Sequence, residues 1–386
     1  MNRLKIISGH LSPAGSTDHE RDLWGSTCGS GPAGSSGPED VVVVHGLRTA
    51  TGRAKRGSFK NTTPDELLSA VMTAVLKDIG LSPNQLGDVC VGNVLQPGAG
   101  ALMARVSQFL SVESMSLRAM GNPGDLSSRL VDIDKARDCI IPMGITSENV
   151  AERFGVSREK QDAFALGSHQ KAARAQSAGR FREEIVPVTV TMVDDRGEDR
   201  AVTVEEDEGV RPGTTLEGLA KLRPVFKPDG STTAGNSSQV SDGAAALLIG
   251  RRAAVKALGL PVLGVLRASA VVGVPPDVMG IGPAVAIPAA LEQAGLSVAD
   301  VDVFEINEAF SSQAVYCVEK LGIPPEKVNP NGGAIALGHP LGCTGARQVV
   351  TLLHELRRRG RRAYGVVSMC IGTGMGAAAV FEHPGP

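Results

Sequence analysis

The chain has 386 residues, of which 42% are hydrophobic and 21% are charged, and its formal net charge at pH 7 is −2. A chain of this length and composition can bury the cores of two domains. Its near-neutral charge argues against nucleic acid or an acidic membrane surface as a partner. Nowhere does the sequence reach the roughly eighteen consecutive apolar residues that a membrane-spanning helix needs.

The cysteines are scattered through the chain without the spacing of metal ligands. They are Cys28, Cys90, Cys139, Cys317, Cys343 and Cys370. In a chain of this size the pattern predicts no metal site and indicates a reducing compartment.

Residues 1–38 differ in composition from the rest, because Gly, Ser and Pro dominate from Ser12 onward. We expect this segment to lie outside the fold. At its start stand Arg3, Leu4, His10 and Leu11, and a short helix would carry Leu4 and Leu11, seven residues apart, on one face. From the residues alone, a frayed tail and a targeting signal both remain open.

The first predicted strand is V-V-V-V-H, residues 41–45. A helix follows, with Thr63 as N-cap, Pro64 at its first position and Glu66 three residues after the cap, and it ends at Gly80. We expect a second strand around Val89–Val91.

A helix ending at Leu110 is predicted next, followed directly by V-E-S-M-S, residues 112–116. Residues 117–225 are charged throughout and contain a helix-like run and a hairpin-like run, which indicates an inserted segment. Apolar strand-like sequence returns at residues 241–249.

The chain contains an internal repeat. Residues 64–93 and 283–307 both run Pro, helix, G-L-S and then D-V-x-x-x-N, ending at Asn93 and Asn307. S-D-G-A-A-A-L-L-I, residues 241–249, is echoed by G-M-G-A-A-A-V-F-E, residues 374–382. Strands that alternate with helices in both copies predict an α/β fold in layers, with central strands buried on both faces.

His339 lies in the glycine-rich loop N-P-N-G-G-A-I-A-L-G-H-P-L-G-C-T-G, residues 329–345. The glycines permit positive φ and close approach to a ligand, and Pro340 keeps the chain extended. A helix follows and ends in Arg357, Arg358 and Arg359, which compensate the helix dipole. A lone loop histidine is more often merely exposed than catalytic, so the rest of the chain decides its role.

Cys370 lies at the end of the strand-like run A-Y-G-V-V-S-M, beside the glycine turn C-I-G-T-G-M-G. A thiol in such a place can lie next to backbone N–H donors. A buried cysteine that acts as a small hydrophobic residue is the simpler interpretation of this residue alone.

Three motifs taken together, N-E-A-F at residues 307–310, G-H-P at 338–340 and C-x-G at 370–372, resemble those of the thiolases, and most closely the peroxisomal 3-ketoacyl-CoA thiolases. The resemblance implies a layered αβαβα fold of two duplicated halves. The first half would comprise residues 39–116 and 226–258, the second half residues 259–386, and residues 117–225 would form the loop domain that covers coenzyme A.

The resemblance also implies a function, namely thiolysis of 3-ketoacyl-CoA in peroxisomal fatty acid β-oxidation by a homodimer, with coenzyme A as substrate and no other cofactor. R-L-x5-H-L at Arg3, Leu4, His10 and Leu11 resembles the amino-terminal peroxisomal signal of this subgroup, read by an import receptor. Cys28 would then mark the site at which the presequence is cut.

In the family reaction, His339 would act as general base and would hold the oxyanion together with a water on Asn307. Cys370 would protonate the departing acetyl-CoA carbanion. The backbone N–H of Gly372 would serve the acyl stage, and Ser238 would lie against the pantetheine arm of coenzyme A.

One part of the family pattern is absent. Between its second helix and its closing strand, the second half has residues 322–365, whereas the first half passes from Leu110 to Val112 with one residue between. In thiolases this part of the first half carries a strand and a helix, with the acyl-accepting cysteine in a sequence like N-x-x-C-x-S-G. We therefore expect a first half without that strand, helix and nucleophile, with an opened sheet and weakly protected amides at residues 41–44.

Cys90, Cys139 and Cys343 do not fit the position of the nucleophile, since they lie in a strand-like run, in the inserted segment and at a helix start. Activity of the shortened chain is therefore doubtful. The alternatives are a non-catalytic binder of CoA esters or a subunit that associates with intact thiolase. A β-ketoacyl synthase has the same layered fold but needs a second histidine where this chain has Cys370.

Overall fold

The computed structural model describes residues 33, 36–96, 111–117, 127–193 and 196–385. The expected targeting residues Arg3, Leu4, His10 and Leu11, the expected cut at Cys28 and the helix expected to end at Leu110 lie outside the described residues.

The two halves of the chain each build one part of a curled sheet. The first half contributes β1 (Val41–Thr49), β2 (Gly52–Arg53), β3 (Ser111–Ser114) and β7 (Ser241–Arg251), and β4 (Ile185–Val186) pairs with β1. The second half contributes β8 (Gly264–Gly273), β9 (Val303–Ile306), β10 (Ala363–Ile371) and β11 (Met375–His383). The two parts join where Val42 and Val43 of β1 face Val265 and Gly264 of β8.

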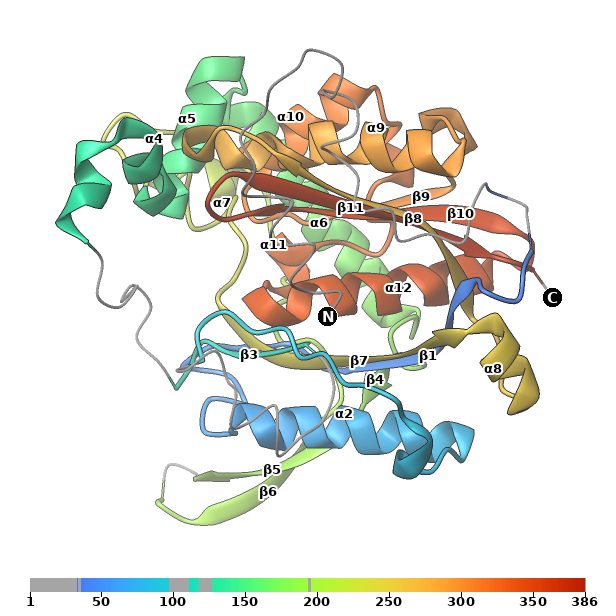
Figure 1. The fold of residues 1–386 in the computed structure, drawn as a ribbon. Helices are drawn as coiled ribbons and strands as arrows, with labels where there is room; N and C mark the ends of the chain where they lie inside the picture. The colour runs from blue at the N-terminus through green and yellow to red at the C-terminus, as the bar shows by residue number, and fades with distance from the viewer. Residues whose placement is uncertain (1–32, 34–35, 97–110, 118–126, 194–195, 386) are drawn as a thin grey trace.

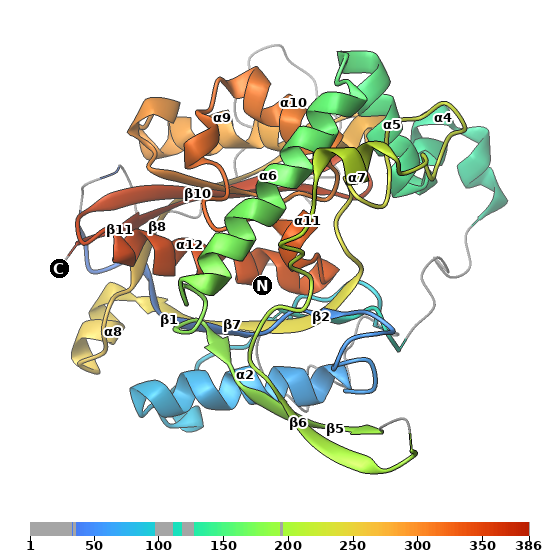
Figure 2. The same cartoon turned by 180° about the vertical axis from the view of Figure 1, so that it is seen from behind.

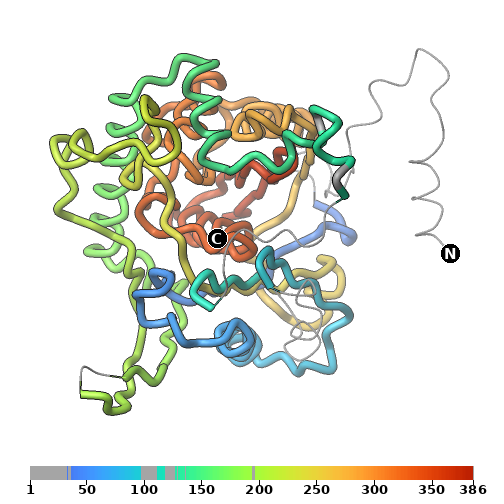
Figure 3. The backbone as a smooth tube through the Cα atoms, turned by 90° about the vertical axis from the view of Figure 1, so that its left-hand side faces the viewer, coloured from blue at the N-terminus to red at the C-terminus, as the bar shows by residue number. Residues whose placement is uncertain are grey.

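The elements form the layers that the sequence predicts (Figure 1). Helix α12 (Thr344–Arg358) lies between the two parts of the sheet, α2 (Pro64–Ile79) covers the outside of the first, and α9 (Gly282–Ala294) and α10 (Ser311–Leu321) cover the outside of the second. In Figure 3 the blue first-half segments lie below the orange and red second half. Because α12 is enclosed on both sides, even its polar residues Arg347 and Gln348 are buried.

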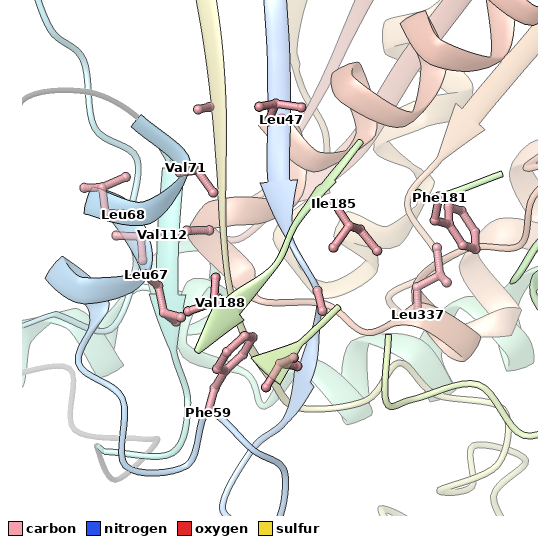
Figure 4. Close-up of a cluster of buried hydrophobic side chains, with 14 of the residues drawn as sticks. Leu47, Phe59, Leu67, Leu68, Val71, Val112, Phe181, Ile185, Val188 and Leu337 are labelled. Atoms are coloured by element: carbon pink, nitrogen blue, oxygen red, sulfur yellow. The ribbon is translucent and has the colours of Figure 1, made fainter. Parts of the chain in front are cut away.

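Helix α2 begins and ends as its sequence predicts. The N–H of Thr63 donates to the Glu66 carboxylate at 2.8 Å, and Gly80 ends the helix with φ 65°. Its apolar face packs on the first-half sheet in a cluster of buried side chains that includes Leu47, Leu67 and Val112 (Figure 4).

The internal repeat is present in three dimensions. β7 lies antiparallel to β1, and β11 lies antiparallel to β8, so the echoed G-A-A-A runs occupy the same place in each half. Helix α9 ends at Gly295 with φ 67°, as α2 ends at Gly80.

The segment inserted in the first half, residues 117–225, contains two long helices and a hairpin. The helices are α5 (Met143–Phe154) and α6 (Arg158–Ser177), and the hairpin strands are β5 (Val188–Val193) and β6 (Asp199–Val204). The segment also contains the shorter helices α4 (Asp134–Arg137) and α7 (Leu216–Ala220), whereas α8 (Arg252–Ala257) follows β7 and α11 (Ala334–Leu337) lies in the loop before His339. Figure 2 shows α6 crossing the back of the layers. Buried Arg48 of β1 ties the segment to the first half through ion pairs with Glu184 and Asp207, each at 2.7 Å.

Two expectations for the first half were wrong. Residues 89–91 form no strand, because β3 is only four residues long and offers them no ladder of hydrogen bonds. One hydrogen bond, from the Val112 N–H to the Gly92 carbonyl at 3.0 Å, links β3 to the segment that follows residues 89–91. The sheet is also not opened at residues 41–44, because β1 pairs with β7 on one side and with β8 on the other. The first half therefore keeps a paired, buried first strand despite its short β3.

Candidate active site

Asn307 and Cys370 are positioned by two neighbouring parallel strands. Ile306 of β9 faces Ser368 of β10, so both residues come at the carboxyl ends of their strands. The Asn307 N–H donates to the Ser368 carbonyl at 2.9 Å and continues the ladder by one step. The carboxyl ends of parallel strands are where α/β folds place their reactive groups.

His339 reaches the same place from the glycine-rich loop. Gly338 has φ 115°, and a Cβ there would collide with Ser241 Oγ, so this position requires glycine. The main-chain N–H of His339 donates to the Gln239 carbonyl at 3.1 Å. The loop is thereby fixed against the segment that leads into β7.

The imidazole of His339 is held by two side chains. Its Nε2 lies 3.3 Å from Nδ2 of Asn307, and its Nδ1 lies 2.6 Å from Oγ1 of Thr344. An amide nitrogen only donates, so with Asn307 in this orientation Nε2 is the acceptor and the proton is on Nδ1. Nε2 therefore carries a lone pair, as a general base requires.

Burial keeps both titratable groups of the site neutral at pH 7. It lowers the pKa of His339 to about 4, and the charge of Arg347 acts in the same direction. Burial raises the pKa of the Cys370 thiol to about 12 against the opposing effect of a hydrogen bond with Gln313. The site thus contains an unprotonated base and a protonated thiol.

Gln313, in the first turn of α10, connects these groups and was not singled out by the sequence. Its Nε2 donates to the Asn307 carbonyl at 3.3 Å, and its side chain also bonds Cys370. The buried Oδ1 of Asn307 has no hydrogen-bond partner among the described residues. It can accept one hydrogen bond from a water, as the expected oxyanion arrangement needs.

Glu308 is a second residue that sequence reasoning missed. Its buried carboxylate accepts hydrogen bonds from Ser168 at 2.6 Å, Asn329 at 2.7 Å and the Ile335 N–H at 3.1 Å. Burial raises its pKa. Glu308 therefore fixes the loop that carries His339, and its place directly after Asn307 was the available signal.

The remaining expected site residues lie nearby, with different exposure. The half-buried Ser238 donates its main-chain N–H to the Ala309 carbonyl at 3.0 Å, directly beside the run that begins at Asn307. Gly372 is exposed in the turn between β10 and β11, two residues after Cys370.

Neither Cys90 nor Cys343 is bonded to His339 in the described structure, whereas Sγ of Cys139 donates to the Thr373 carbonyl at 3.7 Å, in the turn that follows Cys370. The hydrogen-bond partners of His339 within the described residues are Asn307, Thr344 and Gln239. Cys343 packs against Ala245 of β7, and burial raises its pKa to about 12. Cys90 is exposed.

No helix in the described residues has the length and apolarity to cross a membrane.

A duplicated layered α/β fold with a histidine, an amide and a thiol at its strand ends defines an acyl-transfer type of site. The thiolase N-terminal domain model matches residues 41–111 and 109–253, and the thiolase C-terminal domain model matches residues 260–383. The chain belongs to the thiolase family.

Individual relatives support this membership. The chain is 66% identical to the peroxisomal 3-ketoacyl-CoA thiolase of Homo sapiens, with all of both chains covered. It is 49% identical to peroxisomal 3-ketoacyl-CoA thiolase 1 of Arabidopsis thaliana, covering 99% of this chain and 96% of that one. The crystal structure of the dimeric peroxisomal thiolase of Saccharomyces cerevisiae superposes with a TM-score of 0.83 at 44% identity, covering 90% of this chain and 98% of that one.

The comparisons also bear on the first half. The alignment with the human relative spans 426 positions, 40 more than the 386 residues of this chain. The match to the N-terminal domain model comes in two pieces that meet at residues 109–111. This is the junction at which the repeat indicated a missing strand and helix.

Proposed function

We propose that the chain is a peroxisomal 3-ketoacyl-CoA thiolase by descent, that it binds acyl-CoA and CoA, and that it has lost the acyl-accepting cysteine. The contact between His339 and Asn307, with Gln313 linking the Asn307 carbonyl to Cys370, carries the proposal. These groups act on the substrate carbonyl and its α-carbon, and they come from the intact second half.

The retained reaction is exchange of an α-proton of acetyl-CoA. The Cys370 thiolate takes a proton from the methyl carbon, and the electron pair moves onto the thioester oxygen. That enolate oxygen accepts hydrogen bonds from Nε2 of His339 and from a water on Asn307. Return of a solvent-derived proton from the Cys370 thiol completes the exchange without an acyl-enzyme.

Thr344 allows His339 to serve in this step. In the resting arrangement the imidazole proton is on Nδ1, whereas donation to the enolate needs it on Nε2. A hydroxyl both donates and accepts, so Thr344 can bond either tautomer. Thr344 is therefore a positioning residue in this proposal.

The test is a pair of assays on the full-length protein. CoA-dependent cleavage of 3-ketoacyl-CoA should be absent, since loss of a nucleophile removes several orders of magnitude in rate. Binding of acetyl-CoA and slow incorporation of deuterium from heavy water into its methyl group should both be present. Cys370→Ala should abolish the incorporation, whereas the exposed control Cys90→Ala should leave it unchanged.

Two results would reject this assignment. Thiolysis at an ordinary rate, roughly 1–10³ per second, that is lost in Cys343→Ser or Cys90→Ser would identify one of these as the nucleophile. Binding of acetyl-CoA with deuterium incorporation that Cys370→Ala leaves unchanged would support the alternative of a CoA-ester binder or partner subunit.

The location, import and assembly of the chain belong to the same proposal. Relatives named as peroxisomal place it in the peroxisome, and Arg3, Leu4, His10 and Leu11 would be read by the import receptor. The Saccharomyces cerevisiae relative is named as dimeric, and we propose a homodimer here too. Arg3→Ala should leave a fluorescently tagged chain in the cytosol. Analytical ultracentrifugation of the unaltered protein would measure whether it forms a dimer.

A further inference from the structure

A large apolar groove lies beside the short strand β3. It has a volume of about 900 Å³ and runs between β7, α8, the loop after α2 and the start of α12. Its apolar lining includes Leu86, Leu247, Ile249, Ala346, Val349 and Phe381. This volume is at the upper end of the range for binding pockets, roughly 300–1,000 Å³.

One side of the groove is an open strand edge. β3 pairs with β7 only between Asp242 and Ala245. Beyond Ala245, residues 246–251 of β7 pair with β1 on one side and with no strand of the described residues on the other. Residues 247–251 line the groove, so the backbone donors and acceptors of this edge face it.

In the second half of the molecule, the corresponding strand edge is paired with another strand. The repeat aligns residues 246–249 of β7 with residues 379–382 of β11. There β10 covers the edge of β11 from Ala363 facing His383 to Ile371 facing Met375. Glu382 of β11 is 4% exposed, whereas its counterpart Ile249 of β7 is 51% exposed. The groove is thus the counterpart of the place that residues 363–367 of β10 fill.

We propose that this groove binds an extended segment of another polypeptide, with apolar side chains at alternate positions, as a strand antiparallel to β7. An extended peptide supplies N–H and C=O groups to residues 246–251 and apolar side chains to Leu247, Ile249 and Val349. A fatty acyl chain or a helix would fill the volume but would leave the strand edge unpaired. The proposal is independent of the proposed catalysis.

The probe for the test is a fluorescent peptide with the β10 sequence R-A-Y-G-V-V-S-M, residues 362–369. It should bind the full-length protein saturably in an anisotropy titration without any CoA ester. Two N-methylated versions, methylated at alternate amides, provide the matched control, because only one set of amides faces β7. One version should bind at least tenfold more weakly, and the other should bind within about twofold of the parent.

Substitutions on the protein complete the test. Ile249→Lys, at an exposed position, should weaken peptide binding at least tenfold, whereas Val271→Lys on β8, where the side chain is 53% exposed, should not change it. Absence of saturable binding would overturn the proposal, as would equal binding of both N-methylated peptides. Displacement of a groove-bound dye by oleate but not by the peptide would assign the groove to a lipid instead. Self-association that is lost in Ile249→Lys, without any peptide binding, would assign it to a second copy of this chain.

Discussion

Glu113 and Cys370 occupy corresponding places in the two halves of the molecule. Glu113 faces Gly243 of β7, Cys370 faces Gly376 of β11, and these glycines correspond in the repeated sequence. Glu113 is fully buried and accepts hydrogen bonds from the N–H groups of Val94 at 2.8 Å, Leu95 at 3.3 Å and Gly342 at 3.3 Å. Where the second half has a thiol in its site, the first half has a carboxylate that anchors two backbone segments, residues 94–95 and Gly342.

Glu113→Ala should destabilise the protein. It removes the acceptor of three partly buried hydrogen bonds, each of which contributes about 0.5–1.5 kcal/mol, so we expect a loss of about 2–4 kcal/mol in the free energy of unfolding measured with urea. Glu183→Ala, which removes an exposed ion pair with Arg357, is the control and should change little. Equal midpoints for the two variants would show that Glu113 is not an anchor.

The rate of α-proton exchange should rise with pH. Exchange needs the Cys370 thiolate, and the pKa of this thiol is raised to about 12, so the reactive fraction should grow about tenfold per pH unit from pH 7 to 9. His339, with its pKa lowered to about 4, stays neutral over this range, so its titration does not change the slope of the exchange rate against pH. Deuterium incorporation measured by mass spectrometry would check this, and a plateau near pH 8.5 would indicate an ordinary exposed thiol.

Thr344→Val should slow exchange without weakening binding. Valine retains the shape of threonine but cannot bond Nδ1 of His339, so we expect exchange to fall by about tenfold to a hundredfold, with an unchanged Kd for acetyl-CoA by calorimetry. Thr344→Ser restores the hydroxyl and should recover most of the rate. A parallel loss of binding in Thr344→Val would mean that the substitution disturbs the fold.

Glu305 should make stability fall as the pH rises. Burial raises its pKa to about 8, despite Arg347 at 3.4 Å. A carboxyl that holds its proton more tightly in the folded state stabilises the fold fully below its unfolded pKa near 4.5, and this contribution is lost as the pH rises towards 8. Glu305→Gln should therefore flatten the pH dependence of unfolding between pH 5 and 8, and unchanged slopes in the two proteins would contradict the shift.

Amide hydrogen exchange should distinguish paired from unpaired segments. We expect slow exchange at residues 42–43, 303–306 and 365–369, which lie inside ladders, and fast exchange at 89–91. Within 246–251, alternate amides should exchange fast, and the β10 peptide should protect them. Uniform slow exchange across 246–251 without peptide would show that the edge is already paired.

The sequence predicted the layers, the repeat and the clustering of His339, Asn307 and Cys370, because glycine positions, helix caps and apolar periodicity are local signals. It failed at residues 89–91, where apolar residues with strand propensity form no strand. A strand needs a neighbouring strand, and the described part of the chain places none beside residues 89–91. Thr344 and Gln313 were missed because they act through other side chains, a relationship that only the folded chain displays.

The expectation of an opened first half was wrong for a related reason. Loss of a strand was expected to expose residues 41–44, but β1 is secured by β7 and β8, which both come from later parts of the sequence. Among the described residues, the edge of β7 beyond Ala245 is left without a partner strand. Pairing between distant segments cannot be deduced from the composition of the first half.

The two residue pairs that join β1 to β8 connect the halves by backbone as well as by packing. Dividing the gene between residues 258 and 259 would give two fragments. In one fragment β1 would have an unpaired edge at this seam, and in the other β8 would. Neither fragment is a self-contained module, although the repeat suggests one. The duplicated halves therefore share one continuous sheet, and each covers a strand edge of the other.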